Sequence, residues 1–131
     1  MSLGRMIASL TNSLWTKAAS GLCVLFIIVY SLIPQAERVG TGVTGKCEHV
    51  LAYGGTGLLL ALSFRSEKGP LFAATLLAFM ACLLEFLQQW APGRHPRVSD
   101  AVVSAAAGAL GAAVAAWLRY YARPSQNAKH G

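Results

Sequence analysis

Ionisable and amide side chains gather in one short part of a chain that is otherwise strongly apolar. The segment EFLQQWAPGRHPRVSD, residues 85–100, contains Glu85, Gln88, Arg94 and Asp100. A carboxylate inside a membrane is costly and usually faces protein or water, where it acts as a base, a proton carrier or the partner of a cation. An arginine in a turn binds phosphate or carboxylate through two parallel hydrogen bonds. The segment therefore predicts a polar site for a proton, an anion or both.

A second polar group lies earlier in the chain. Lys46, His49 and Tyr53 are spaced so that they share one side of a helix. A histidine near a membrane boundary can transfer protons at neutral pH, and Tyr53, one turn deeper, can hydrogen-bond the same ligand. Both are also common interfacial anchors, and the pattern alone favours neither interpretation.

The other candidates also have structural alternatives. Glu85 could instead tie two helices together through a salt bridge or hydrogen bond. Arg94 could pair with Asp100, which already suits the positive end of the helix that follows it. The chain contains no phosphate-binding loop, no GxSxG, no HExxH and no CxxC, so we expect no metal and no cofactor. Whether it is an enzyme stays open; Glu85 and His49 would be the catalytic residues if it is.

The composition indicates which elements position these residues. Of 131 residues 55% are hydrophobic and 12% charged, whereas soluble domains average about 25% charged. The excess lies in four apolar runs, 18–33, 50–64, 70–90 and 101–118. With its flanking residues each run approaches the roughly 20 residues that a membrane-crossing helix needs. Since the runs are apolar all round, the sequence predicts an all-α, four-helix transmembrane bundle, whose second helix must also include Lys46 and His49.

The distribution of charge predicts the orientation of this bundle. The two ends of the chain and the RSEKG turn carry all of the +6 net charge, whereas the other two connections are neutral. Positive charge marks cytoplasmic loops, so both termini are expected in the cytoplasm and the polar site faces outward. Residues 1–16 are then a cytoplasmic segment, 17–120 the membrane domain and 121–131 a cytoplasmic tail. The basic side suits anionic lipid, and no nucleic-acid partner is expected.

The polar side chains fall on faces where membrane helices pack, because such interfaces favour small residues. In the run 70–90, Glu85 shares a face with Ala81, whereas Leu77 and Leu84 are expected to face lipid. One polar cluster inside the outward half of the bundle is therefore predicted. In the last run the same face continues from polar into small residues: Asp100, Ser104, Ala107, Gly108, Gly111 and Ala115.

Taken in order, these motifs resemble those of the VanZ-like family of small multi-pass bacterial membrane proteins. The likeness covers roughly residues 20–118. Gly45 and Ser104 depart from the family pattern, which often has Asp and Asn at these positions. The motifs are K-x-x-H-x-x-x-Y at Lys46, His49 and Tyr53, E-x-x-Q-x-x-x-P-G-R from Glu85 to Arg94, S-D at Ser99 and Asp100, and the glycines Gly108 and Gly111.

The resemblance implies a protein of the bacterial inner membrane with both termini inside. The founding member of the family is associated with low-level resistance to the glycopeptide teicoplanin, but no molecular activity comes with the resemblance. We therefore expect a site that binds or modifies an anionic headgroup of a cell-envelope lipid or glycan precursor. Its ligand-binding residues would be Lys46, Tyr53, Gln88, Arg94, Asp100 and Ser104.

Two other classes of function remain open at this point. The chain could be a non-enzymatic membrane scaffold or an accessory subunit of an envelope complex, and a small transporter is the third alternative. The expected partners are membrane lipids and a lipid-linked anionic ligand. A homo-oligomer or a membrane-protein partner is compatible with the sequence.

Overall fold

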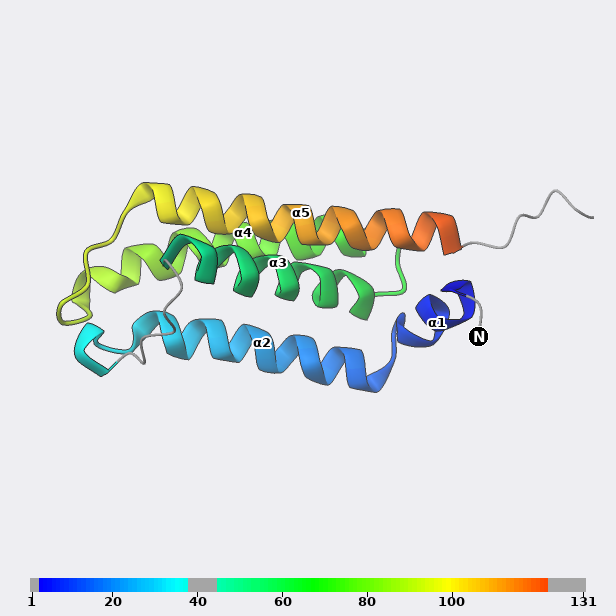
Figure 1. Cartoon of the computed structure of the whole chain (residues 1–131), viewed down its shortest axis with the longest axis horizontal. Helices are drawn as coiled ribbons and strands as arrows, with labels where there is room; N and C mark the ends of the chain where they lie inside the picture. The colour runs from blue at the N-terminus through cyan, green and yellow to red at the C-terminus, as the bar shows by residue number, and fades with distance from the viewer. Residues whose placement is uncertain (1–2, 38–44, 123–131) are drawn as a thin grey trace, which may run out of the picture.

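A computed structural model describes residues 3–37 and 45–122, and all regular structure within these ranges is helical. The predicted all-α class is therefore confirmed for the described part of the chain. Four long helices run side by side, and a short one lies at one end (Figure 1). The helices are α1 Leu3–Leu10, α2 Leu14–Leu32, α3 Gly45–Ser63, α4 Gly69–Leu87 and α5 Val98–Ala122, with 3-10 turns η1 Gln35–Glu37 and η2 Gln88–Trp90.

Three of the described helices are long and apolar enough to cross a membrane, namely α2, α4 together with η2, and α5. Large apolar side chains such as Phe26, Phe79 and Leu110 are exposed on them, as a lipid-facing surface requires. These helices indicate a membrane protein. The helix α3 has 19 residues, but Lys46, Glu48 and its glycines make it less apolar, so a fourth membrane crossing stays a prediction. Its start at Gly45 agrees with the expected inclusion of Lys46 and His49.

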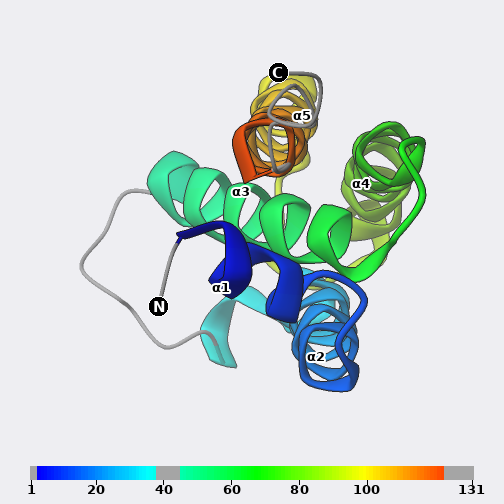
Figure 2. The ribbon, with the colours of Figure 1, turned by 90° about the vertical axis from the view of Figure 1, so that its right-hand side faces the viewer.

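The helix α3 is the inner element of the bundle and packs against α2, α4 and α5 (Figure 2). Its closest approach is to α5. A Cβ atom added to Gly111 would overlap the carbonyl oxygen of Gly54, and one added to Gly57 would overlap that of Gly108. Glycine at these positions lets the two backbones touch, so the close packing expected of Gly108 and Gly111 is confirmed.

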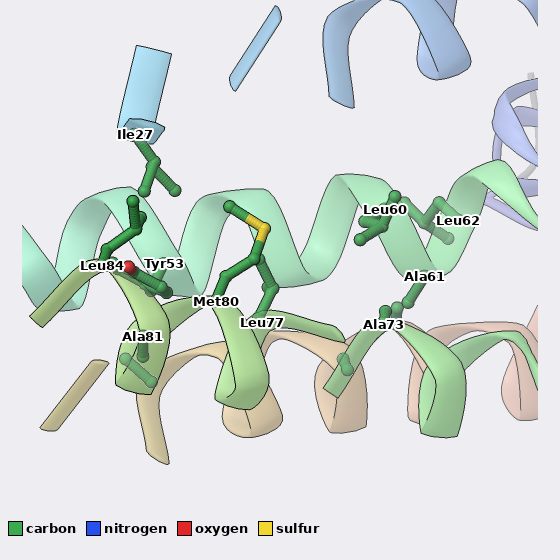
Figure 3. Close-up of a cluster of buried hydrophobic side chains, with 13 residues drawn as sticks. Ile27, Tyr53, Leu60, Ala61, Leu62, Ala73, Leu77, Met80, Ala81 and Leu84 are labelled. Carbon is green, nitrogen blue, oxygen red and sulfur yellow. The ribbon is translucent and has the colours of Figure 1, made fainter. Parts of the chain in front are cut away.

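The core between α3 and α4 corrects one sequence-based expectation. Leu77 and Leu84 do not face lipid: they are 0% and 4% exposed and pack against α3 (Figure 3). A Cβ atom on Gly108 would lie only 3.0 Å from the Cβ of Leu77. Leu77 therefore fills the groove that this glycine opens on α5. The buried side of α4 includes Ala81 and Glu85, as expected, but it extends to Leu77 and Leu84 because a small residue on α5 leaves space for a large one.

The helix α1 is an element for which the sequence analysis had no expectation. Its side chain Ile7 is buried, and a Cβ atom on Gly4 would lie 3.1 Å from the carbonyl oxygen of Ala122 at the end of α5. A hydrogen bond holds the loop after α1 against the end of α3: the backbone N–H of Asn12 donates to the carbonyl oxygen of Leu62 at 3.0 Å. Ser13 then caps α2 by accepting from the Thr16 amide. The helical spacing of the large apolar residues in LGRMIASL, namely Leu3, Met6, Ile7 and Leu10, was the available signal.

Candidate functional site

A pocket of about 490 Å³ lies between α2 and α3, at the end of the bundle where α5 begins. This volume is in the range of small-molecule sites, about 300–1,000 Å³. Apolar side chains from α2, including Phe26 and Ile27, form much of its wall. The ionisable and hydroxyl side chains of its lining are Tyr30, Ser31, Glu37, Glu48, His49, Tyr53 and Arg94.

His49 and Tyr53 lie together on the α3 side of the pocket. Their rings stack with centroids 6.2 Å apart. The Nδ1 atom of His49 is 2.8 Å from the Oγ atom of Ser104, a side chain that is 1% exposed on α5. A hydroxyl can donate or accept, so Ser104 fixes the ring in either tautomer. Because Nδ1 is occupied, Nε2 is the ring nitrogen that can meet a ligand.

Arg94 closes the pocket from the turn between η2 and α5. Gly93 allows this turn through its positive φ of 73°. The Nη2 atom of Arg94 donates to the carbonyl oxygen of Ser31 at 2.7 Å. That carbonyl belongs to the last turn of α2, where helix carbonyls need partners from outside the helix. Arg94 therefore anchors the end of α2 and lines the pocket at the same time.

Glu85 has a structural partner and stands outside the pocket lining. It is 8% exposed, and its Oε1 atom accepts a hydrogen bond from the backbone N–H of Arg97. The bond ties the end of α4 to the segment that leads into α5. Gln88 is buried in η2 next to it. The geometry thus gives Glu85 the helix-tying role that the sequence analysis kept as its alternative.

The remaining predicted residues lie around the pocket rather than in its lining. Lys46 is exposed in the first turn of α3. Asp100 is half-buried in the first turn of α5, where its amide donates to the carbonyl of Arg97 at 2.8 Å and its carboxylate accepts from the Ser99 hydroxyl at 3.3 Å. Of the predicted site residues, the structure therefore brings His49, Tyr53 and Arg94 into one pocket. Ser104 lies directly behind His49.

Sequence reasoning missed four polar members of the lining. Glu37 and Glu48 were counted only for their charge, and Tyr30 and Ser31 only as part of an apolar run. Two polar residues side by side near the end of a membrane helix were a usable signal, because such groups seek protein or water. The position of Glu37 in η1 depends on the path of the chain after α2. No periodic pattern of apolar residues predicts that path.

A second cavity of about 320 Å³ continues from the pocket along the α2–α3 groove. The two cavities share Phe26, Ile27 and Ala52, and the second has an apolar lining apart from Cys23 and Thr56. Gly55 lines this second cavity, and a Cβ atom added there would meet nothing within 4 Å. The groove therefore passes from polar at the Arg94 end to apolar near the middle of α3.

Comparison of the chain with protein-family models, curated proteins and solved structures finds no match. The fold and the pocket define an all-helical membrane protein with an amphipathic groove between two of its helices. The likeness to the VanZ-like family rests on the motifs in the sequence and stays a prediction.

Proposed function

We propose that the chain is a VanZ-like protein of the bacterial inner membrane that binds a lipid-linked ligand in the α2–α3 groove. The observation that carries the proposal is the continuity of a polar pocket with an apolar groove. This gradient matches an amphiphile, with its headgroup beside His49 and Arg94 and its hydrocarbon chain along Phe26 and Gly55. Binding of the amphiphile in this groove requires no bond to be made or broken. If the protein is an enzyme, Nε2 of His49 is the group in position to transfer a proton.

The charges of the lining refine the kind of headgroup. Arg94 offers a guanidinium, which suits a phosphate. Glu37 and Glu48 line the same pocket, and carboxylates repel a purely anionic group while they accept hydrogen bonds from hydroxyl or amine donors. We therefore place a phosphate at Arg94 and a sugar or amine near Glu48. A phosphate-linked glycan precursor of the cell envelope has both parts, which is also how altered teicoplanin sensitivity would arise.

The proposed orientation puts this pocket on the outer side of the membrane. The opposite end carries most of the basic residues, and cytoplasmic loops are the basic ones. The ligand would then enter from the outer leaflet, sideways between α2 and α3. Basic residues in described helices and turns at the opposite end are Arg5, Lys17, Arg65, Lys68 and Arg119.

A blocked groove provides the test of this proposal. In Gly55→Leu the new side chain enters the apolar cavity without meeting other atoms near its Cβ. Gly21→Leu on α2 is the matched control, since its Cβ also meets nothing within 4 Å and Gly21 lines neither cavity. Both changes favour the helix by about 1 kcal/mol, so neither should unfold the protein.

The readout is native mass spectrometry of protein extracted gently from its own membrane. Wild type and Gly21→Leu are expected to retain a phosphate-bearing lipid. Gly55→Leu should retain about tenfold less, which corresponds to about 1.4 kcal/mol. Equal retention in all three proteins would contradict a ligand in the groove.

A membrane scaffold is the second candidate, and one observation favours it. Three polar contacts around the pocket are internal to the protein: His49 with Ser104, Arg94 with the Ser31 carbonyl, and Glu85 with the Arg97 amide. Such a network fixes how helices pack. Under this alternative, Gly55→Leu leaves the retained lipids unchanged, and a protein partner is lost when the network is broken.

A further inference from the structure

The opposite end of the bundle contains another cavity, of about 610 Å³. It lies between α1, the turn from α3 to α4 and the last turn of α5, which meet at that end (Figure 1). None of its lining residues belongs to the α2–α3 groove. The polar side chains of the lining are Thr11, Asn12, Arg65, Glu67 and Arg119.

Arg119 is held rigidly in this lining. Its Nη2 atom donates to the carbonyl oxygens of Arg65 at 2.8 Å and Ser66 at 3.1 Å. Its Nη1 atom is buried and has no hydrogen-bond partner among the described residues. Buried polar atoms in folded proteins are nearly always bonded to protein, water or a ligand. A positioned guanidinium with an unused buried donor is therefore a feature of a site that binds an acceptor.

The charge around this cavity favours a negatively charged acceptor. Arg65 and Arg119 face a single carboxylate, Glu67, in the lining. Arg5 in α1, Lys17 in the first turn of α2 and Lys68 in the turn from α3 to α4 belong to segments that meet at this end of the bundle (Figure 1). Their summed field raises the local concentration of anions. Two guanidinium groups match the oxygen geometry of a phosphate better than that of a smaller anion.

The position of the cavity along the bundle matches the depth of lipid headgroups. Exposed aromatic side chains surround this end, and such residues concentrate where a membrane meets water. Met6 and Leu10 are exposed on α1 beside the cavity, which suits a helix that lies in the interface. The exposed aromatic residues at this end include Trp15, Phe72, Trp117, Tyr120 and Tyr121.

We infer that this cavity binds a phosphate group through Arg65 and Arg119. The phosphate belongs either to an anionic phospholipid of the adjacent leaflet or to a soluble phosphate-bearing molecule. The inference does not depend on the α2–α3 groove or on the orientation of the chain.

Arg65→Gln is the variant that tests the site without breaking its frame. The Arg65 side chain is exposed, and the hydrogen bond from Arg119 goes to the backbone carbonyl oxygen of Arg65, which the substitution keeps. Lys68→Gln is the matched control, because it removes the same charge from the same turn but lies outside the lining. Glu67→Gln removes the carboxylate and should strengthen binding. A thermal unfolding curve for each variant confirms that it is folded.

Binding is measured in nanodiscs of phosphatidylcholine with added phosphatidylglycerol, and separately by titration with inorganic phosphate. We expect wild type and Lys68→Gln to retain phosphatidylglycerol, Arg65→Gln to retain about tenfold less, and Glu67→Gln to retain more. Phosphate that binds in an Arg65-dependent way, without selective lipid, supports the site and assigns it to a soluble ligand. Equal losses in Arg65→Gln and Lys68→Gln, or no binding of either probe by wild type, would overturn the inference.

Discussion

The two ends of the bundle differ in the ligands that they can accept, and different elements line the two sites. At the end where α5 begins, the pocket is walled by apolar and aromatic side chains, contains Glu37 and Glu48, and opens into an apolar groove. At the end where α5 finishes, the cavity is lined by two arginines, Arg65 and Arg119, and by one carboxylate, that of Glu67. The first arrangement suits an amphiphile, whereas the second suits a phosphate.

In the middle of the bundle the face of α3 that packs against α5 leaves no room for a ligand, whereas the α2–α3 groove lies on another side of α3. There α3 and α5 touch through Gly54, Gly57, Gly108 and Gly111, and Leu77 fills the groove beside them. No space of ligand size can persist where backbones are in contact. The glycine contact thus holds both sites in place.

The largest expected effect comes from breaking the glycine contact. In Gly111→Ala the new methyl group would overlap the carbonyl oxygen of Gly54, so α3 and α5 must move apart. We expect a loss of about 3 kcal/mol or more in stability, measured as a lower thermal midpoint, with binding lost at both ends. Gly21→Ala, whose Cβ meets nothing within 4 Å, should be neutral or slightly stabilising. A Gly111→Ala protein as stable as this control would contradict the packing.

A smaller effect, confined to one end, is expected from Ser104→Ala. This change removes the partner of the His49 Nδ1 atom inside the bundle. Stability should fall by about 1 kcal/mol, and retention of the lipid in the α2–α3 groove should weaken while phosphate binding at the other end stays unchanged. Ser99→Ala, an exposed change on the same helix, is the control. If Ser104→Ala weakened both sites equally, the two ends would be coupled rather than separate.

The smallest effect is expected from Glu85→Gln. The amide keeps an oxygen that can accept from the Arg97 N–H, and Glu85 lies outside the pocket lining. Stability should change by less than about 1 kcal/mol, with ligand retention unaffected, whereas Glu85→Ala leaves the N–H without its acceptor and costs more. Ligand retention that depends on the Glu85 charge would restore the catalytic or binding role considered from the sequence.

The sequence predicted the elements better than the faces on which they meet. Apolar runs located the long helices because hydrocarbon thickness dictates their length, and the glycines of α5 marked its packing side. On α4 the burial of Ala81 and Glu85 followed the prediction, but that of Leu77 did not, since Leu77 fills space that Gly108 creates on another helix. His49, Tyr53 and Arg94 were found through their chemistry, but Glu37 and Glu48 join them only through the way that α2 and α3 come together.

The most direct test of two separate ligand sites measures Gly55→Leu and Arg65→Gln side by side in one native mass spectrometry experiment. The account predicts that Gly55→Leu loses the lipid of the groove and keeps phosphatidylglycerol, whereas Arg65→Gln does the reverse. Loss of the same bound species in both variants would contradict the account, because a single surface of the protein would then be responsible for all of the binding.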